Sequence, residues 1–538
     1  MKIEVKGHSG CQLDIVSEND NMYVYKSTAD PKYLNRLRLQ AEKQKAAAAV
    51  AHQHIRVPQV YDIAHDDKTV VVKMQYVYSK NFVEFFNHAG FEQVEYLIGA
   101  LKYFIEYEVG QCKLEHVPAS VFQEKFAEVA SKVSVNPLYA NDAIVESIIA
   151  RSEAVFQNLT ELLIPVGLCH GDLTFSNILF NGNNYYLIDF LDSFVETPLQ
   201  DIVKIRQDTA YRWSQLMYSK QYDDVRLRIV FDKIDKEIDR YFSEKYSWYR
   251  DYYKVMQLMN ILRILPYAHE EKVIAYLKDI LVSILDDIEG QEVAVEMSTE
   301  DQVLFSESPL KNLIVPVAAD KVEYHEGLPY VFGLDGDGVI ICLKSILGLD
   351  VNQFDNIYFT VLKKHDDKFF VGDNLRLQFK RLGLSNAKVV VLENPTQDQA
   401  ETIYQTILKE NIRGSIFVKD ADSFFKTSIV AGNGIAIYPI EELDILSPKD
   451  KSYVAVDDMY YPTNIIEKNV VGHYISAGGY LIRDAEIYKR YYDRLRGYGK
   501  LYLSHIIYAM LLDKKAFRPM IVEEYKDWGT SNDYRKYE

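Results

Sequence analysis

A short polar motif places side chains at spacings that suit phosphoryl transfer. Residues 168–180 have the sequence LCHGDLTFSNILF, in which Asn177 follows Asp172 by five positions. Asp189 follows in the apolar run YYLIDFLDSF. Phosphoryl transfer needs a carboxylate near the acceptor hydroxyl and ligands for the metal ions that bind the triphosphate. The three side chains are candidates for these parts, and the alternative for Asp172 taken alone is a solvated loop residue.

Four residues upstream are candidates for contacting a nucleotide. Lys26 lies in the strand-like run MYVYKS, which follows a turn containing Gly7 and Gly10, and Glu42 lies in the helix-forming run LNRLRLQAEKQKAAAAVAH. The spacing H-G-D-x-x-x-x-N is that of the catalytic loop of protein kinases, in which a lysine–glutamate pair orients the α- and β-phosphates. Taken singly, Lys26 and Glu42 would be exposed charges, and His170 would hold the loop in shape. The complete set, in this order, favours a kinase-like fold.

HGDLTFSNIL followed by LIDFLDSF resembles the aminoglycoside phosphotransferase and choline/ethanolamine kinase-like superfamily, over about residues 1–290. The resemblance implies a bilobal protein-kinase-like fold. It also implies ATP-dependent, Mg²⁺-dependent phosphorylation of a small alcohol or amino alcohol. Asp172 would be the catalytic base, Asn177 and Asp189 would bind Mg²⁺, and Asp192 would support the site. The glycine turn GHSGC departs from the superfamily, because it is short and is not G-x-G-x-x-G.

The elements expected around these residues form two lobes. Residues 1–80 alternate strand-like runs with one helix, which predicts a small sheet-plus-helix lobe. Residues 81–290 have mostly helical spacing, except for a loop–strand–turn–strand block at 166–194 that carries the polar motif. The clearest helical runs are FEQVEYLIGALKYFIEYEV, DAIVESIIARSEAVFQNLTELL, VMQLMNILRILPYA and KVIAYLKDILVSILDDIE.

The second half of the chain has a different pattern. Residues 291–309 lose the periodicity and gain acids and serines, which predicts a linker before a domain at 310–538. Strands are expected at NLIVPVAA, NIYFTVL, AKVVVLEN, GSIFVKDAD and IAIYPI, with helices near VIICLKSILGL and at QDQAETIYQTILKE. Strands that alternate with helices predict a mostly parallel α/β sheet.

An ordered set of motifs in this half, from ENPTQDQAET and SIFVKDADSFF through NIIEKN to YKDWGT, resembles the sugar-phosphate nucleotidyltransferases. These have a Rossmann-like GT-A fold and include cytidylyltransferases of surface-polysaccharide pathways, so CTP or another nucleoside triphosphate is implied. The resemblance gives metal-binding roles to Asp527 and to Asp420 or Asp422, between which the sequence does not choose. By the same resemblance, Lys468 would contact the acceptor phosphate, and Thr396 and Gln399 would contact the nucleotide or sugar.

The triphosphate loop expected after the first strand of this domain is altered. Residues 318–331 lack the Gly-x-Gly run that lets backbone N–H groups approach phosphates, and Lys321 is the nearest cation. Two interpretations therefore stay open for the second domain. It is an active transferase, which would make the protein bifunctional, or it is a degenerate module that binds a nucleotide or glycan. A protein in which both sites are inactive is the third and least favoured interpretation.

Composition excludes some other functions. The chain has 538 residues and a net charge of −17, which argues against nucleic-acid binding because that depends on Lys and Arg contacts to phosphates. Four scattered cysteines and the absence of an apolar signal core predict a cytoplasmic protein, and no run is long enough to cross a bilayer. The resemblance to transferases of surface-polysaccharide pathways implies a bacterial protein. Aromatic and acidic residues crowd between 211 and 253. They would suit a cationic amine, but helix core is the favoured interpretation.

Overall fold

The computed structural model describes most of the chain, with gaps. The residues described are 2–6, 11–290, 310–319, 324–325, 327–443 and 451–528. Four features predicted from the sequence lie outside them: Gly7, Gly10, the linker 291–309 and Lys321. The chain divides into two compact units. The first comprises Met1–Asn87, Gln93–Tyr222 and Val230–Ser298, and the second comprises His88–Glu92, Asp223–Ile229 and Thr299–Glu538.

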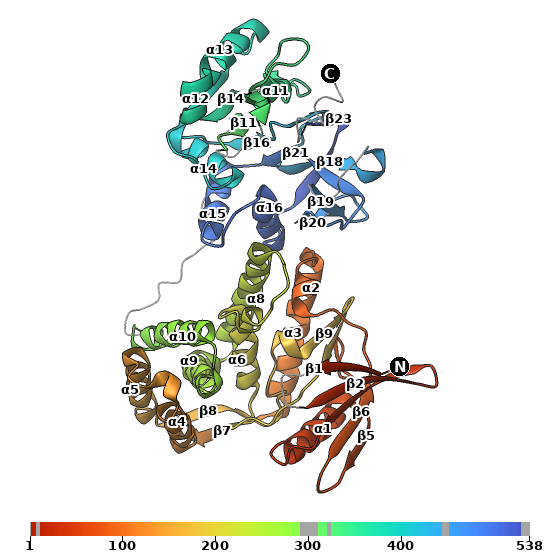
Figure 1. The fold of residues 1–538 in the computed structure, drawn as a ribbon, viewed down its shortest axis with the longest axis vertical. Helices are drawn as coiled ribbons and strands as arrows, with labels where there is room; N and C mark the ends of the chain where they lie inside the picture. The colour runs from red at the N-terminus through yellow and green to blue at the C-terminus, as the bar shows by residue number, and fades with distance from the viewer. Residues whose placement is uncertain are drawn as a thin grey trace. The chain divides into compact units, whose positions relative to one another are not determined.

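The first unit begins with an antiparallel sheet of five strands in the order β1-β2-β3-β6-β5. Their bounds are β1 Lys2–Lys6, β2 Gln12–Glu18, β3 Asn21–Thr28, β5 Val60–His65 and β6 Val70–Gln75. Helix α1 (Leu34–Ala48) packs on this sheet through Leu37 and Ala41, which are buried against Val70 and Val72 (Figure 1). The predicted sheet-plus-helix lobe is confirmed.

The rest of the first unit is mostly helical. Its helices are α2 Phe82–Phe86, α3 Phe91–Gln111, α4 Ala119–Ser134, α5 Ala143–Gln157, α6 Pro198–Thr209, α7 Trp213–Leu216, α8 Asp224–Lys245, α9 Ser247–Leu262 and α10 Glu271–Glu289. The first residues of α3 and α8 fall in segments assigned to the second unit. One prediction is wrong here, because the helical run expected to reach residue 163 ends early. Residues Glu161–Val166 form strand β8, which pairs antiparallel with β7 (Lys113–Pro118). A short apolar run has no periodicity that separates a strand from a helix.

The predicted strand–turn–strand block is present and carries the polar motif. Strands β9 (Ile178–Asn181) and β10 (Asn184–Leu187) form a hairpin, and β10 also pairs with the short strand β4 (Ile55–Arg56). The aromatic stretch between 211 and 253 is largely core, the interpretation that the sequence favoured. Tyr249 and Tyr253 are buried, and the Arg206 guanidinium lies 4.4 Å from the Tyr253 ring centroid.

The second unit is built on a mixed sheet in the order β15-β14-β11-β16-β21-β18-β22. Strands β15, β14, β11 and β16 are parallel, and β22 is parallel to β18. Strand β21 runs antiparallel to both β16 and β18, so it is the one reversed strand among these seven. The bounds are β11 Lys311–Val317, β14 Asn356–Leu362, β15 Ala387–Leu392, β16 Ser415–Lys419, β18 Asn433–Pro439, β21 Tyr474–Ile482 and β22 Phe517–Ile521.

Helices cover this sheet. The helices are α11 Ile341–Lys344, α12 Lys363–Phe369, α13 Val371–Leu382, α14 Gln399–Lys409, α15 Ala485–Leu495 and α16 Leu503–Leu512. The short strands are β12 Tyr324–His325, β13 Leu328–Pro329, β17 Ser423–Lys426, β19 Ser452–Val456, β20 Pro462–Glu467 and β23 Glu523–Asp527. The short strands β19 and β20 extend the sheet, whereas β12 with β13 and β17 with β23 form separate two-stranded sheets. The helix expected near VIICLKSILGL is only the short α11, and α12 and α13 were not predicted. In the described part of the chain, no helix is both long and apolar enough to cross a membrane.

Candidate functional site

The polar motif forms a loop, residues 168–177, here named the catalytic loop. It leaves strand β8 and turns at Gly171, whose φ is +87°. A Cβ at Gly171 would lie 2.0 Å from the carbonyl oxygen of Leu191. The Leu191 N–H in turn donates to the His170 carbonyl at 2.9 Å. Glycine is therefore required where the catalytic loop meets the segment that follows Asp189.

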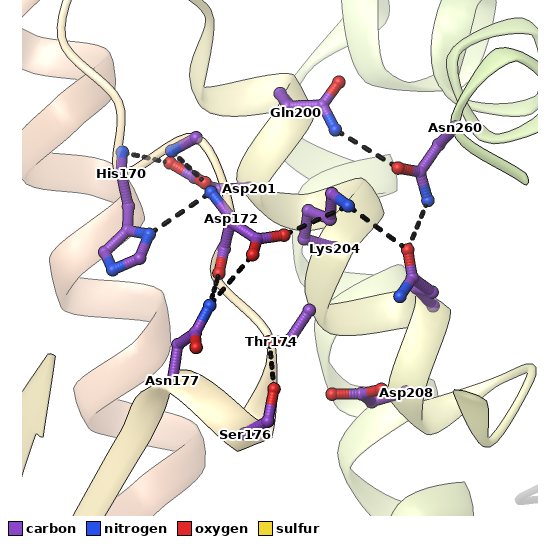
Figure 2. Close-up of polar contacts among 12 residues, drawn as sticks. His170, Asp172, Thr174, Ser176, Asn177, Gln200, Asp201, Lys204, Asp208 and Asn260 are labelled. Carbon is purple, nitrogen blue, oxygen red and sulfur yellow. Dashed lines mark hydrogen bonds and ion pairs between the residues drawn. The ribbon is translucent and has the colours of Figure 1, made fainter. Parts of the chain in front are cut away.

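One face of helix α6 holds the catalytic loop in place (Figure 2). Asp201 accepts two successive backbone N–H groups of the loop, at 2.6 and 2.8 Å. Asp208 accepts a third, from Phe175, at 2.7 Å. Between them, the Lys204 ammonium lies 3.0 Å from the Asp172 carboxylate. The spacing 201, 204, 208 puts all three side chains on one side of a helix, so α6 fixes both the backbone and the charge of the loop.

Asp172 is an ionised carboxylate in this arrangement. Burial alone would raise its pKa, but Lys204 and then His170 and Asn177 outweigh burial, and the pKa lies below its usual value. Asn177 donates from Nδ2 to the Asp172 carboxylate at 3.0 Å and to its carbonyl at 2.8 Å. The carboxylate can therefore accept a proton from a hydroxyl group.

His170 lies beneath the catalytic loop and is fully buried. Its Nδ1 accepts the Asp172 backbone N–H at 3.2 Å, and its Nε2 lies 3.0 Å from the Ile188 carbonyl. Burial lowers the pKa of His170 to about 4, so the ring is neutral near pH 7. This geometry suits the loop-holding role expected for His170.

Asp189 and Lys26 meet across the lobes of the first unit. Lys26 Nζ donates to the Asp189 carboxylate at 2.7 Å, although the two residues are 163 positions apart. The amide nitrogen of Asn177 donates to Asp172, so the amide oxygen of Asn177 is left to bind a cation. A carboxylate and an amide oxygen suit Mg²⁺, which commonly takes one or two protein ligands and completes its shell with phosphates and water. Asn177 and Asp189 would therefore hold the ion.

The predicted ion pair between Lys26 and Glu42 is not formed, and that part of the prediction is wrong. Glu42 accepts from Arg38, one turn earlier in α1, at 2.6 Å. Its neighbour Lys43 points inward instead and donates to the Leu191 carbonyl at 2.6 Å. Successive side chains on a helix point about 100° apart, and Leu37 and Ala41 already occupy the core face of α1.

Asp192 lies at the edge of the same segment. It is exposed and is 4.0 Å from Lys43, which bonds more closely to Glu196 at 2.7 Å. A supporting role for Asp192 would therefore act through Lys43 or through a bound substrate.

Two further buried acids lie behind the catalytic loop. Glu108 is 1% exposed and Asp201 is 0% exposed. Burial raises the pKa of Asp201 to about 7, although its two backbone hydrogen bonds oppose the shift. Burial also raises the pKa of Glu108 well above its usual value, and the neighbouring Asp201 adds to this. The pair therefore retains a proton under conditions in which exposed carboxyl groups have lost theirs.

A cavity of about 260 Å³ opens beside Asp172. Its charged lining residues are Arg36, Asp172, Asp192, Lys204 and Arg263. The residues expected to bind the nucleotide and Mg²⁺, namely Lys26, Asn177 and Asp189, do not line it. The cavity therefore offers space beside Asp172 that those three side chains do not occupy.

Sequence reasoning missed Lys204 and Arg263. The signal for Lys204 was present, because it lies on the same helical face as two aspartates in PLQDIVKIRQD. Arg263 follows α9, 91 positions after Asp172, and carries no local motif.

In the second unit, the predicted aspartates gather where β16 ends. The Asp420 carboxylate accepts from Gln399 Nε2 at 2.6 Å, and burial followed by the charge of Asp422 raises its pKa to about 6. Asp527 pairs in register with Ser423, and the next backbone N–H, that of Trp528, donates to the Asp422 carbonyl at 2.7 Å. Strands β17 and β23 pair antiparallel, which is why residues over 100 positions apart in the sequence meet here.

Two lysines that were not predicted neutralise this cluster. Lys419 is fully buried and donates to the carbonyl oxygens of Asp420 and Ser423 at 2.7 and 2.8 Å, and burial lowers its pKa to about 8. Lys451 lies 2.5 Å from the Asp527 carboxylate. Among the residues that the structure describes, no three His, Cys, Asp or Glu side chains form a group that could hold a metal ion. Asp527, one of the predicted metal ligands, is therefore paired with Lys451 in this structure.

The other residues predicted for this site lie around it. Gln399 contacts Asp420 through the hydrogen bond from its amide nitrogen. Thr396 bonds to Thr402 at 2.7 Å, hydroxyl to hydroxyl. Lys468 is exposed, and its backbone N–H donates to the Lys451 carbonyl at 2.8 Å.

Comparison with known proteins supports the resemblance of the first domain. The profile of the phosphotransferase enzyme family matches residues 17–233, which confirms that prediction. A search of the curated proteins finds no match.

Several solved structures are similar to parts of the chain. A nucleoside-diphosphate-sugar pyrophosphorylase from Vibrio cholerae is 17% identical, with a TM-score of 0.36, over 42% of this chain and 98% of its own. An inositol-1-phosphate CTP transferase from T. maritima is 13% identical, with a TM-score of 0.35, over 42% and 92%. A thermostable mutant of an aminoglycoside phosphotransferase, in a ternary complex with ADP and hygromycin B, is 10% identical, with a TM-score of 0.36, over 53% and 93%. At these identities and scores, the likenesses carry no information on activity.

Proposed function

We propose that the first domain, residues 1–290, uses ATP to phosphorylate a hydroxyl group of a small molecule. One observation carries the proposal. Asp172 is kept as a carboxylate by Lys204 and Asn177, and it lines a cavity large enough for a small acceptor.

The chemistry follows from the roles of the side chains. The acceptor oxygen forms a bond to the γ-phosphorus of ATP while the bond from that phosphorus to the β-phosphate oxygen breaks. Asp172 takes the hydroxyl proton, and ADP leaves. Lys26 lies where it can contact the phosphates, and Lys204 can stabilise charge on the group being transferred. Mg²⁺, held by Asn177 and Asp189, would neutralise the phosphate oxygens.

Phosphorus NMR tests this proposal. The protein is incubated with ATP, Mg²⁺ and a panel of small alcohols, amino alcohols and sugars. A new phosphomonoester signal that is absent with Asp172→Asn is the expected result. ATP consumption that is the same in the wild type and in Asp172→Asn would rule the proposal out.

For the second domain, residues 310–538, we propose transfer of a nucleotidyl group from CTP or another nucleoside triphosphate to the phosphomonoester made by the first. The support is the cluster of Asp420, Asp422 and Asp527 beside the buried Lys419. Such a product would be an activated building block for a surface glycan. Release of pyrophosphate from a nucleoside triphosphate and a synthetic phosphomonoester is the test.

A specific observation favours a second candidate for this domain. Lys451 already pairs with Asp527 at 2.5 Å, which places a fixed positive charge where a transferase of this kind would use a metal ion. A domain that binds a nucleotide or glycan without turnover would show ligand binding by calorimetry and no release of pyrophosphate.

A further inference from the structure

We infer that the acceptor phosphorylated by the first domain carries an anionic group, a carboxylate or a phosphate, close to its reactive hydroxyl. This inference rests on the proposed kinase activity and names the substrate class for it.

The charges around the cavity are the first support. Three cations, Arg36, Lys204 and Arg263, line it, against two carboxylates, Asp172 and Asp192. Lys204 is paired with Asp172 at 3.0 Å, and Asp192 is exposed, 4.0 Å from Lys43. The guanidinium groups of Arg36 and Arg263 are therefore the charges in the cavity that can bind a ligand.

Arg263 is the stronger of the two arginines. It is partly buried, and its guanidinium lies 5.3 Å from the ring centroid of Phe194. Within the described part of the chain, no group forms a hydrogen bond or ion pair with this guanidinium. Burial lowers the pKa of Arg263, and the nearby Asp172 offsets this only in part. The desolvated charge is thus under-compensated, and a planar anion could bind it through two parallel hydrogen bonds.

The cavity is poorly suited to a cationic acceptor. No aromatic side chain is among its lining residues, so it offers no ring face to a quaternary or primary amine. A cationic amine would also face the like charges of Arg36 and Arg263.

The inference assigns separate tasks to the neighbouring cations. Lys204 contacts the base and is close to the reacting oxygen. Arg263 would hold the anionic group of the acceptor, with Arg36 beside it. The loss of Arg263 should therefore weaken binding of the acceptor and leave binding of ATP unchanged.

Sorting possible acceptors by charge tests the substrate class before the compound itself is identified. A small-molecule extract of the cells that make the protein is divided by ion exchange at neutral pH into cationic, neutral and anionic fractions. Each fraction is incubated with the full-length protein, Mg²⁺ and ATP labelled with ³²P at the γ-position. The inference expects labelled product from the anionic fraction, and labelled product mainly from the cationic or neutral fraction would overturn it. Failure to label any fraction, with Asp172→Asn equally inactive, would instead overturn the proposed kinase function and the inference with it.

Matched acceptors and variants then test the residues. Glucuronate, glucose and glucosamine form one set of acceptors, and glycerate and glycerol form another. In each set that reacts, the anion should have the highest kcat/KM.

Arg263→Gln should raise KM for the active acceptor about 10- to 100-fold, the usual range for a lost charged hydrogen bond, and leave KM for ATP unchanged. Arg263→Lys should recover part of the loss because it retains the charge. Arg240→Gln, which removes an exposed arginine paired with Glu237, is the control. An Arg263→Gln variant that matches this control, or that affects KM for ATP instead, would contradict the assignment.

Discussion

The close approach at Gly171 offers a direct test of how the catalytic loop is positioned. In Gly171→Ala, the new methyl group would lie 2.0 Å from the Leu191 carbonyl oxygen. Real Cβ atoms keep at least 3.0 Å from such neighbours, so one of the two segments must move by about 1 Å. The residue must also keep a φ of +87°, which an alanine rarely adopts.

The expected cost follows from these two changes. A non-glycine residue in the left-handed region costs about 1–2 kcal/mol. The movement also breaks the hydrogen bond between the Leu191 N–H and the His170 carbonyl, which contributes about 0.5–1.5 kcal/mol. The free energy of unfolding should fall by about 1.5–3.5 kcal/mol in total. A displacement of about 1 Å near the reacting atoms should lower kcat about 10²-fold.

Gly182→Ala is the matched control for this variant. Gly182 lies in the turn between β9 and β10, and its φ is +55°. A Cβ there would meet nothing within 4 Å. This variant should show only the left-handed cost of about 1–2 kcal/mol and keep its activity.

Urea unfolding measures the stability of the two variants, and the initial rate of ATP-dependent phosphorylation measures their activity. The reasoning fails if Gly171→Ala matches Gly182→Ala in both. It also fails if Gly171→Ala loses stability but keeps kcat, because the contact would then not position the base.

Three further variants test the electrostatics of the two sites. In Lys204→Met, only the weaker effects of His170 and Asn177 would oppose burial, so the pKa of Asp172 should rise and the acid limb of the kcat/KM profile should move to higher pH. An unmoved limb would count against Asp172 as the base. The pKa of Asp201 is raised from 3.8 to about 7, so the folded state holds a proton that the unfolded state has lost, and the free energy of unfolding should fall as the pH rises between these values. Glu108→Gln should flatten this fall in urea midpoints, whereas an identical slope would show that the pair is not its source. If the second domain is a transferase, Asp420→Asn should lower pyrophosphate release about 10²-fold, and full retention would favour the binding-module interpretation.

Local patterns in the sequence predicted much of the first unit. The helix containing Glu42 and the strand containing Lys26 were expected from composition and spacing, and both are present. The helical phase of Glu42 was not apparent, because an alanine-rich helix has no sharp apolar stripe to fix its orientation. The short apolar run at Glu161–Val166 also gave no periodicity, and its pairing with β7 depends on a segment more than 40 positions away.

The sequence by itself determined which polar side chains the catalytic loop and the segment after the hairpin present, because the spacing of Asp172, Asn177 and Asp189 is set by a few bonds of chain and one hairpin. Only the tertiary structure decided what surrounds that loop. Lys26 reaches Asp189 because the sheet of the small lobe is packed beside the hairpin. Lys204 and Arg263 reach the acceptor cavity because α6 and the end of α9 lie behind it. These contacts join residues up to 163 positions apart, and burial rather than local spacing sets their charge and strength.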